Sequence, residues 1–342
     1  MRLQYSFSLL SADARAEVKP NFCRYFCSKI SPKSEIEVVR KHALCDQRKI
    51  ERYGRIFAAQ MNDNKVAVIT GASSGIGFET TLGLAKDGFK IIALGRNAGR
   101  IEAAKVAIGE SVRGARIDWI RADLSSMAEV RQAAQKIAEL TGHINVLINN
   151  AGQILGEKTV TVDGLEQTFA GNVLAPFLLT GILLPLMSQA GQGHVVTTAS
   201  VGHSFIDDMF WDDIQFEQEY HGAMAYLQSK LGNILFTREL ARRHPEIISS
   251  AIHPGTVQSN FPDSADDQTK AYFAAAIERG ELVSPKQAAD TLLWLARESR
   301  NALPSGGYFY ERKRIEPSEA ASNDASAMRL WQICEELVGV AY

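Results

Sequence analysis

Short apolar runs alternate with stretches of helical periodicity from residue 65 onward. The runs are rich in β-branched residues and cover 65–70, 90–94, 117–121, 144–149, 194–199, 248–253 and 307–310. Apolar positions three and four apart mark helices between them, at about 75–87, 98–109, 126–140, 163–189, 223–243 and 285–298. A last amphipathic stretch around Leu330, Trp331 and Leu337 predicts a C-terminal helix. Strands without polar alternation are buried on both faces, so the pattern predicts an α/β fold with a doubly wound parallel sheet of about seven strands.

Residues 1–60 differ from the rest of the chain in charge and pattern. They hold twelve Lys and Arg against six Asp and Glu, a net charge of +6, which leaves −8 for residues 61–342 because the whole chain carries −2. They show no sustained helical periodicity, and the first apolar run comes shortly after Met61. We therefore expect a basic, poorly ordered extension over 1–60 and a single folded domain over 61–342. The extension either binds an acidic partner or targets the protein, or is an upstream stretch included by a wrongly chosen start codon.

The composition is that of a globular protein with a sizeable core. Of the 342 residues, 46% are hydrophobic and 22% are charged. This balance excludes a fully disordered chain, a collagen-like repeat and a disulfide-rich miniprotein. A net charge of −2 gives no overall attraction to nucleic acid or to an anionic membrane. We expect neither as a partner.

No stretch is long and apolar enough to predict a membrane span. The richest run, Leu174 to Met187, has 14 residues and contains Pro176 and Pro185, whereas a span needs about 20. A buried helix is the better interpretation. The four cysteines are Cys23, Cys27, Cys45 and Cys334. The first two have no matching pair at zinc-ligand spacing, so neither a metal site nor an oxidising compartment is expected.

A glycine-rich turn joins the first predicted strand to the first predicted helix. Glycines at this junction let the backbone approach a pyrophosphate, and the helix N-terminus presents unpaired N–H groups and a partial positive charge to it. The spacing is G-x3-G-x-G rather than the commoner G-x-G-x-x-G, so its position after the first strand carries the interpretation. The candidate dinucleotide-binding residues in this turn are Gly71, Ser73, Ser74, Gly75, Ile76 and Gly77.

The ends of the next strands indicate which nicotinamide cofactor is bound. An NAD site usually places an acid at the end of the second strand to hold the ribose 2′-hydroxyl. This chain has Arg96 there, and a guanidinium can pair with a 2′-phosphate through two hydrogen bonds, so we expect NADP(H) in preference to NAD(H). After the third strand, Asp123 and Leu124 lie where a carboxylate can meet the adenine amino group. Small residues leave room for the adenosine where the fourth strand ends, at Asn150, Ala151 and Gly152.

Tyr226 and Lys230 lie one helical turn apart, so their side chains share one face of the helix predicted at 223–243. A tyrosine phenol titrates near ~10 in water, and a general acid or base works best near the operating pH. A neighbouring ammonium favours the phenolate and lowers the pKa of the phenol. A drop of about three units requires ~4 kcal/mol, which close charges and an oxidised nicotinamide can supply. This pair forms the candidate proton-transfer site.

These motifs occur in an order that resembles the short-chain dehydrogenase/reductase family. The resemblance covers about 65–310 and rests on TGASSGIG, Asp123 and Leu124, NNAG, Asn172, Ser200, YLQSK and the triplet His253-Pro254-Gly255. It implies a Rossmann-type fold for the domain and a dehydrogenase or reductase activity. The segment AYLQSKLGNILFTRELARR is similar to the retinol dehydrogenase and WW-domain oxidoreductase-like branch. That branch carries an insertion before the catalytic tyrosine, which agrees with the separation of 26 positions from Ser200 to Tyr226.

The family resemblance implies a catalytic tetrad of Asn172, Ser200, Tyr226 and Lys230. Tyr226 would exchange a proton with the substrate oxygen, while Ser200 donates a hydrogen bond to that oxygen. Lys230 would bind the nicotinamide ribose and lower the pKa of Tyr226, and Asn172 would hold a water that relays protons to Lys230. The cofactor supplies the hydride. Besides Tyr226 and Lys230, the segment after the sixth strand would contact the nicotinamide through Pro254, Gly255 and Thr256.

Two segments are expected to form the substrate end of the site: the insertion at 201–222 and the loop at 256–284. Their large apolar side chains can line a pocket for a hydrophobic aldehyde, ketone or alcohol, or can close a small core: Phe205, Met209, Phe210, Trp211, Phe216, Phe261, Tyr272 and Phe273. The acids of the insertion are expected to form a solvated rim rather than a metal site: Asp207, Asp208, Asp212, Asp213, Glu217 and Glu219. His203 and His221 of the insertion could face the pocket, but a surface position is favoured for both.

The sequence therefore predicts an NADP(H)-dependent oxidoreductase that interconverts an apolar carbonyl compound and its alcohol. The alternatives are a non-catalytic NADPH-binding sensor or partner protein, which would usually have lost the Tyr or the Lys, and an epimerase that retains its cofactor. The branch often carries an N-terminal membrane anchor; we see none in this sequence and expect a cytoplasmic protein. The resemblance also implies a homodimer or homotetramer formed through two long helices, here about 163–189 and 223–243.

Overall fold

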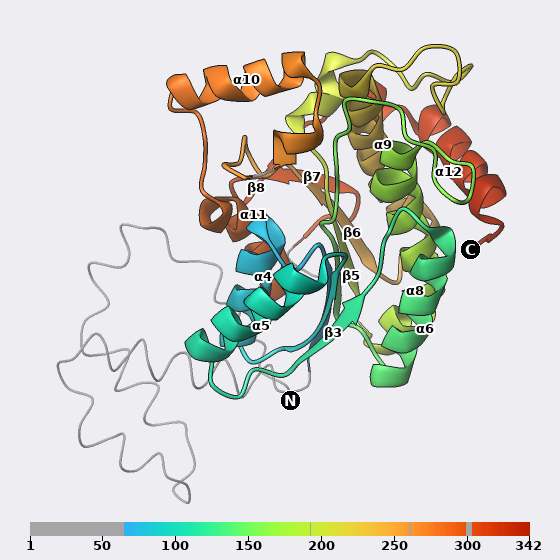
Figure 1. Ribbon diagram of the computed structural model, residues 1–342. Coiled ribbons are helices and arrows are strands. Elements are labelled where there is room, and N and C mark those ends of the chain that lie inside the picture. Colours follow the sequence, from blue (N-terminus) through green and yellow to red (C-terminus); the bar gives the residue numbers. More distant parts are fainter. Residues whose placement is uncertain (1–64, 192, 260, 299–302) are drawn as a thin grey trace, which may run out of the picture. The chain divides into compact units, whose positions relative to one another are not determined.

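The computed structural model describes residues 65–191, 193–259, 261–298 and 303–342. The predictions about residues 1–60 lie outside the described residues, as do residues 61–64. Figure 1 shows the described part as a twisted sheet with helices on both faces. The predicted α/β fold with a doubly wound, largely parallel sheet is confirmed.

Within the described residues the sheet has eight strands in the order β3-β2-β1-β4-β5-β6-β7-β8. They are β1 (Val66–Thr70), β2 (Lys90–Gly95), β3 (Ile117–Arg121), β4 (Val146–Asn149), β5 (His194–Thr198), β6 (Ile248–Ile252), β7 (Gly307–Tyr310) and β8 (Lys313–Ile315). The first seven pair in parallel and lie where apolar runs predicted strands. The eighth strand pairs antiparallel with β7. The sequence analysis missed it because a strand of three residues, two of them charged, gives no recognisable pattern. The strand order reverses between β1 and β4, which places a ligand crevice at the carboxyl ends of these strands.

Alternate residues of the central strands face two separate cores. In β1, Val66 and Val68 pack under the helices of one face, whereas Ala67 and Ile69 pack under those of the other. The first face carries α6 (Met127–Leu140), α8 (Ala175–Gln189), α9 (Gly222–Arg243) and α12 (Asp324–Val338). The second carries α4 (Gly75–Lys86), α5 (Ala98–Ser111) and α11 (Pro285–Arg297). Burial on both sides explains why the strands lack polar alternation.

The helix predicted at 163–189 is divided into three pieces. It begins as α7 (Gln167–Phe169), continues as a π-helical turn, η2 (Ala170–Leu174), and becomes α8 at Ala175. Its start is set by Glu166, whose buried carboxylate accepts hydrogen bonds from the backbone N–H groups of Thr168 and Phe169. The π-helical turn contains Asn172, and such turns occur frequently at functional sites.

The same helical stretch, Gln167–Gln189, is the one among the described residues that could cross a membrane by length and composition. However, 72% of its most apolar window is buried inside the domain. Core helices of globular domains meet the same criteria, so this helix is weak evidence for a span. The expected absence of a membrane span stays a prediction, as does the cytoplasmic location.

The segment expected to be a loop at 256–284 contains a helix that was not predicted, α10 (Asp267–Glu278). Asp266 begins this helix by accepting a hydrogen bond from the Thr269 backbone N–H at 2.7 Å. Only Ala276 is buried along α10, so the helix has no broad apolar face that periodicity could reveal. In Figure 1 it lies beyond the carboxyl ends of the strands.

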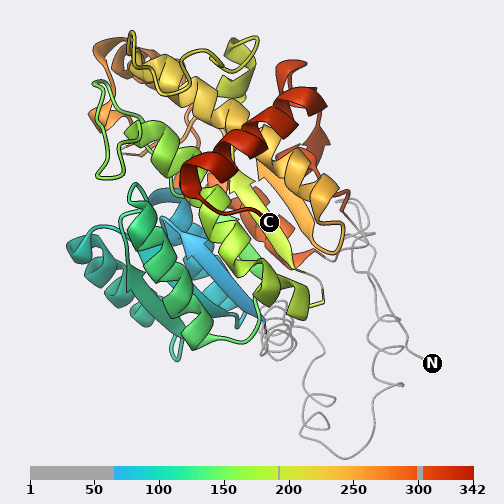
Figure 2. The ribbon, with the colours of Figure 1, turned by 90° about the vertical axis from the view of Figure 1, so that its right-hand side faces the viewer.

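The predicted C-terminal helix is α12, and it is anchored by aromatic rings. The Trp331 side chain is 1% exposed and packs edge-on against Phe177 of α8, with ring centroids 4.9 Å apart, and parallel to Phe236 of α9 at 6.0 Å. The guanidinium of Arg243 lies 4.7 Å from the Trp331 ring. Tyr342 adds its ring to the cluster and donates a hydrogen bond to the Phe177 carbonyl oxygen at 2.8 Å. α12 therefore covers part of the two long helices, as Figure 2 shows; the oligomeric state stays a prediction.

We predict that Trp331→Ala lowers the free energy of unfolding by about 3–5 kcal/mol, because it removes the largest fully buried side chain of this cluster. Urea denaturation with a fixed m-value would measure the change. Met328→Ala, on the same helix but 40% exposed, is the matched control and should stay within about 0.5 kcal/mol. Equal losses in the two variants would show that the aromatic cluster does not anchor α12.

Candidate active site

The turn between β1 and α4 has a backbone that requires glycine. Gly71 and Gly75 have φ angles of +66° and +54°, in the left-handed region that side chains rarely adopt. A Cβ atom on Gly77 would lie 2.1 Å from the Gly71 carbonyl oxygen, so the first turn of α4 packs directly on the glycine turn. A Cβ atom on Gly75 would meet nothing within 4 Å, so at this position the backbone faces open space.

The N-terminus of α4 is suited to bind an anion. Ser74 is its N-cap residue, in extended conformation, and its side chain makes no capping hydrogen bond. The N–H groups of the first turn are therefore left without a side-chain acceptor, and they add to the partial positive charge of the helix N-terminus. Ser73 packs close by, against the end of β2 at Gly95. Together with the open backbone at Gly75, this fits a pyrophosphate as the sequence predicted.

Thr70 joins the glycine turn to the NNAG segment, and the sequence analysis missed it. Its hydroxyl oxygen accepts hydrogen bonds from the backbone N–H groups of Asn150 and Ala151, at 2.9 and 3.0 Å. The Asn150 side chain returns a hydrogen bond to the Thr70 carbonyl oxygen at 3.0 Å. The carboxyl ends of β1 and β4 are thus held together. A Cβ atom on Gly152 would lie 3.4 Å from Nζ of Lys230, so glycine keeps this path open beside the lysine.

Arg96 and Asp123 lie side by side at the edge of the sheet where β2 and β3 end. The Arg96 guanidinium lies 3.7 Å from the Asp123 carboxylate, and the Arg96 side chain is 60% exposed. Nε of Arg121 donates a hydrogen bond to the Arg96 carbonyl oxygen, which brings a second guanidinium to this corner. Leu124 packs against the core under α6. The Asp123 carboxylate is held by hydrogen bonds from Ser125, whereas the exposed Arg96 guanidinium can bind an anionic group from solution.

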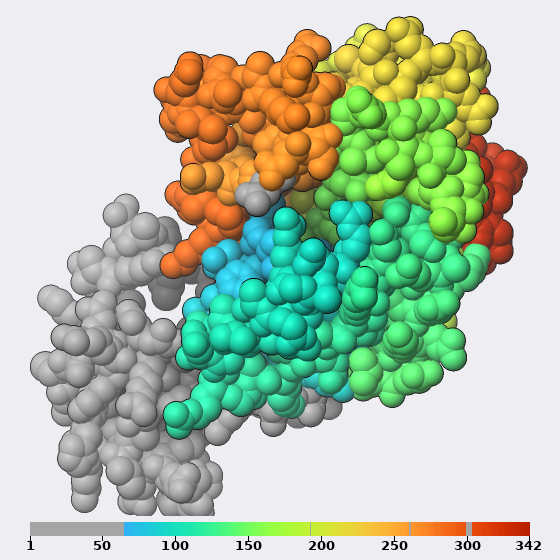
Figure 3. Space-filling view, in the orientation of Figure 1, coloured from blue at the N-terminus to red at the C-terminus, as the bar shows by residue number. Residues whose placement is uncertain are grey.

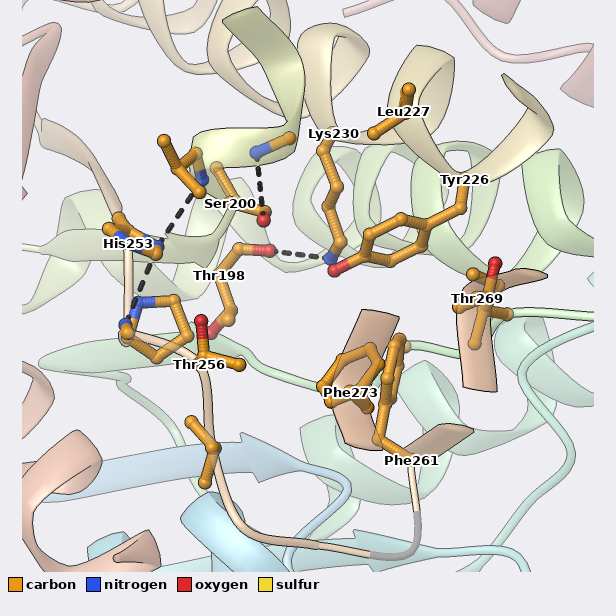
Figure 4. A pocket seen from close by; sticks show the side chains of 18 of the residues that line it. Thr198, Ser200, Tyr226, Leu227, Lys230, His253, Thr256, Phe261, Thr269 and Phe273 are labelled. Atoms are coloured by element: carbon orange, nitrogen blue, oxygen red, sulfur yellow. Dashed lines mark hydrogen bonds between the residues drawn. The ribbon is translucent and has the colours of Figure 1, made fainter. Parts of the chain in front are cut away.

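The tetrad residues converge although they come from three different parts of the fold. Tyr226 and Lys230 lie on α9, Ser200 precedes the 3₁₀ helix η3 (Val201–Phe205), and Asn172 lies in η2. Lys230 Nζ donates a hydrogen bond to the Thr198 carbonyl oxygen at 2.9 Å and lies 5.5 Å from the centre of the Tyr226 ring (Figure 4).

Asn172 uses its amide to fasten the surrounding backbone. Its Oδ1 accepts from the Gln153 N–H at 2.9 Å, and its Nδ2 donates to the Gln153 carbonyl oxygen at 2.8 Å and to the Ser229 hydroxyl at 3.0 Å. The Ser229 hydroxyl in turn donates to the Tyr226 carbonyl oxygen at 2.7 Å. The Asn172 side chain therefore links the backbone of Gln153 to α9 through hydrogen bonds. The water relay implied by the resemblance stays a prediction.

Burial dominates the electrostatics of Tyr226 and Lys230. It raises the pKa of Tyr226 to about 12, although a side-chain hydrogen bond with Ser200 opposes this shift. It lowers the pKa of Lys230 to about 8. The direction for Tyr226 is opposite to the one expected from the lysine alone, because the Lys230 ammonium is directed to a backbone carbonyl and burial penalises the phenolate. In this structure the phenol is protonated at neutral pH.

Tyr226, Ser200 and Lys230 line a cavity of about 430 Å³. The cavity extends to Ile76 in the first turn of α4 and to Asn150 and Gly152, so it joins the tetrad to the glycine turn. The predicted residues Pro254, Gly255 and Thr256 also line it. Figure 3 shows the surface hollowed between the orange segment that contains α10 and the green segment after β4.

The aromatic candidates divide between the cavity and the core. The cavity is lined by Phe205, Phe261, Tyr272 and Phe273. The Phe261 ring lies 5.3 Å from the Tyr226 ring, and Figure 4 shows Phe261 and Phe273 side by side below the phenol. The remaining candidates pack on the core of the first sheet face, or, for Phe216, against Phe210 beside it: Met209, Phe210, Trp211 and Phe216. Both interpretations of these residues were thus partly right.

The prediction of a surface position was wrong for His203 and right for His221. His203 is 3% exposed and contacts the Ser200 carbonyl oxygen, whereas His221 is exposed and pairs with Glu219. His253 was noted only as part of a motif, yet it lines the cavity. Within the described residues, no three His, Cys, Asp or Glu side chains gather closely enough to hold a metal ion.

Comparison with known proteins agrees with this geometry. The family model for short chain dehydrogenases matches residues 65–270. The chain belongs to this family. Mouse retinol dehydrogenase 12 is 34% identical over 285 residues, covering 81% of this chain and 87% of its own. Human retinol dehydrogenase 11 is 32% identical over 278 residues, covering 81% and 86%. The predicted resemblance to the retinol dehydrogenase branch is confirmed.

Solved structures share the fold of this chain. An uncharacterized protein from Mycobacterium paratuberculosis is 28% identical with a TM-score of 0.66, covering 82% of this chain and 95% of its own. The Pseudomonas aeruginosa RhlG/NADP active-site complex is 27% identical with a TM-score of 0.57, covering 72% and 93%. A nicotinamide cofactor therefore belongs to this fold, and the glycine turn of this chain fits one.

We predict that Gly77→Ala abolishes tight nicotinamide dinucleotide binding, because the new methyl would force the Gly71 carbonyl out of its position. Fluorescence titration with NADPH and with NADH should show Kd raised by at least about 100-fold, because the turn that contacts the dinucleotide would be displaced. Gly109→Ala in α5, where a Cβ meets nothing within 4 Å, is the control and should bind like the parent. Unchanged binding by Gly77→Ala would contradict the assignment of this turn.

Proposed function

We propose that this short-chain dehydrogenase uses NADPH to reduce an apolar aldehyde or ketone to its alcohol, with Tyr226 as the proton donor. The observation that carries the proposal is the common cavity: Tyr226, Ser200 and Lys230 line it, and it extends to Ile76 at the α4 turn. A proton donor, a hydrogen-bond donor and a cofactor-binding turn thus open onto one space. The reverse reaction, alcohol oxidation, uses the same groups.

The residues at the sheet edge divide the binding of the dinucleotide among them. The glycine turn would hold the pyrophosphate, Arg96 the 2′-phosphate, and Asp123 the adenine amino group. Lys230 and the turn at Pro254 to Thr256 would hold the nicotinamide half. When bound, the nicotinamide supplies the hydride or accepts it. The preference for NADPH rests on Arg96, and the NADP named in the RhlG complex supports it by likeness.

The protonation state of Tyr226 favours the reducing direction. With its pKa raised to about 12, the phenol holds a proton through the neutral range and can give it to a carbonyl oxygen. The Ser200 hydroxyl oxygen accepts from the Gly202 N–H at 3.0 Å, so its proton points elsewhere and would be shared between the Tyr226 oxygen and the substrate oxygen. These two donors would stabilise the charge that develops on that oxygen. Lys230, whose ammonium is bonded to the Thr198 carbonyl oxygen, would hold the nicotinamide ribose in a fixed position relative to the Tyr226 phenol.

The walls of the cavity favour an apolar substrate. Phe205, Phe261 and Phe273 line it together with Leu227 and Met224. Apolar walls with a few convergent polar groups are typical of sites for small hydrophobic ligands. The names of the retinol dehydrogenase relatives agree with this chemical class. The alternatives of a sensor and of an epimerase gain no specific support from the geometry.

Tyr226→Phe should lower kcat for carbonyl reduction by at least about 100-fold, the usual contribution of a general acid. Its NADPH Kd should stay within about 2-fold, because the ring and the lysine remain. An NADPH-consumption assay over aldehydes, ketones, quinones and retinoids, with NADH as the control cofactor, would measure this. Tyr310→Phe is the matched control, since the ring stacks on His253 without lining the cavity.

Retained turnover in Tyr226→Phe would remove Tyr226 from proton transfer. NADPH binding without oxidation by any compound of the panel would instead favour the sensor. Release of a rearranged sugar or isomer with no net cofactor change would favour the epimerase.

Arg96→Ala should raise KM for NADPH by about 10- to 100-fold, because the variant loses the charged hydrogen bonds between the guanidinium and the 2′-phosphate. KM for NADH should change by no more than about 2-fold, because NADH lacks the 2′-phosphate. Steady-state kinetics with both cofactors at saturating substrate would test this. Arg113→Ala, an exposed arginine near the end of α5, is the control. An equal loss with both cofactors would show that Arg96 does not select NADPH.

A further inference from the structure

The peptide group between Ser200 and Val201 is held at both of its polar ends by histidine rings. Nδ1 of His203 lies 2.7 Å from the Ser200 carbonyl oxygen. Nδ1 of His253 accepts a hydrogen bond from the Val201 N–H at 3.3 Å. His203 belongs to the insertion and His253 follows β6, so the two rings reach one peptide from different elements. The Ser200 side chain next to this peptide carries the hydroxyl proposed to bind the substrate oxygen.

The hydrogen-bond partners determine the tautomer of each ring. The Ser318 backbone N–H donates to Nε2 of His203 at 3.1 Å, so that nitrogen carries no proton and Nδ1–H is the donor to Ser200. Nδ1 of His253 accepts from Val201 and, at 3.4 Å, from the Gly255 N–H, so its proton is on Nε2. Each ring works only as a neutral imidazole. Burial lowers the pKa of both, that of His253 to about 4, which keeps them neutral.

Aromatic contacts fix the two rings in place. His203 is 3% exposed and meets the Tyr308 ring edge-on, with centroids 5.1 Å apart. His253 stacks on Tyr310 with centroids 4.9 Å apart and an angle of 28°. Both tyrosines belong to β7, so one strand supports both imidazoles. Figure 4 shows His253 between the backbone after Ser200 and the turn that contains Gly255.

We propose that His203 and His253 are positioning residues for Ser200, which fix its hydroxyl relative to the turn at Pro254 to Thr256. The inference rests on the proposed function. His253 bonds to Gly255 of that turn and to Val201 at once, so it sets the separation between the wall that binds the substrate oxygen and the wall expected to contact the nicotinamide. A displacement of about 1 Å between such groups can lower a rate about 100-fold.

Replacing either ring tests the proposal. His203→Leu and His253→Leu should lower kcat on the order of 10- to 100-fold, because the reacting groups are misplaced, while KM and the NADPH Kd stay within about 3-fold, because the other residues that contact the two ligands remain. In His203→Asn and His253→Asn the amide can take the place of Nδ1 as donor or acceptor, so most of kcat should return. His221→Leu, in the same insertion but exposed, is the control. Leucine variants with parental kcat, or asparagine variants no better than leucine, would overturn the proposal.

A double-mutant cycle with Ser200→Ala separates positioning from a general loss of structure. If the histidines act through the Ser200 hydroxyl, His253→Leu should cost less than about 3-fold in kcat once that hydroxyl is gone. A merely structural role would lower kcat by the same factor in both backgrounds. Additive losses would therefore overturn the inference.

A second readout does not depend on turnover. ¹⁵N NMR of the imidazoles should show the Nδ1–H tautomer for His203 and the Nε2–H tautomer for His253 at neutral pH. The opposite tautomer on either ring, or a charged ring, would overturn the inference even in a chain that reduces no carbonyl compound. A parent protein that binds NADPH but reduces nothing would overturn the proposed function alone, and the tautomers would then decide the inference separately.

Discussion

The buried ammonium of Lys230 is the group on which the arrangement of the site depends. The lysine is 3% exposed, and its nitrogen donates to the Thr198 carbonyl oxygen at 2.9 Å. Within the described part of the chain, no carboxylate lies within ion-pair distance of it. A buried cation without a counter-ion is costly, which is why burial lowers its pKa to about 8. Lys230 and Gly152 both line the cavity, so the ammonium can donate further hydrogen bonds to a polar ligand bound there.

The fold supplies that cation with its neighbours through the geometry of a parallel sheet. Parallel strands end at one edge, so Thr70, Thr198 and Ile252 mark positions that lie together although they are far apart in sequence. Thr70 then ties the glycine turn to Asn150 and Ala151, and the Asn172 amide ties Gln153 to α9 through Ser229. Local hydrogen bonds of a few residue types thus convert a common fold into a particular site. The residues of the site follow different strands, and hydrogen bonds to backbone groups hold them in position.

Sequence reasoning was sufficient where the signal is local. The glycine turn at Gly71 to Gly77, the Tyr226 and Lys230 pair, and the seven parallel strands follow from spacing and apolar runs, and they lie where expected. The contacts of His203 could not be read in this way, because one of its partners, Ser318, is 115 positions distant in sequence. Phe261 and Phe216 are both aromatic residues in predicted loops, yet Phe261 faces the cavity whereas Phe216 is buried against the Phe210 ring. Periodicity does not assign a side in irregular segments, and α10 escaped because its exposed face dilutes the apolar pattern.

The π-helical turn at Ala170–Leu174 has a consequence for attempts to stabilise this protein. A π turn contains one residue more than an α turn, and one residue corresponds to about 100° of rotation around a helix. Deleting a residue here would regularise the helix and relieve an unfavourable local geometry. The same deletion would turn the Asn172 amide away from Gln153 and Ser229, which it joins in this structure. Selection for heat resistance alone would therefore favour a regular helix in which Asn172 no longer bonds to α9. Thermal stability and the geometry of the site place opposite demands on these five residues.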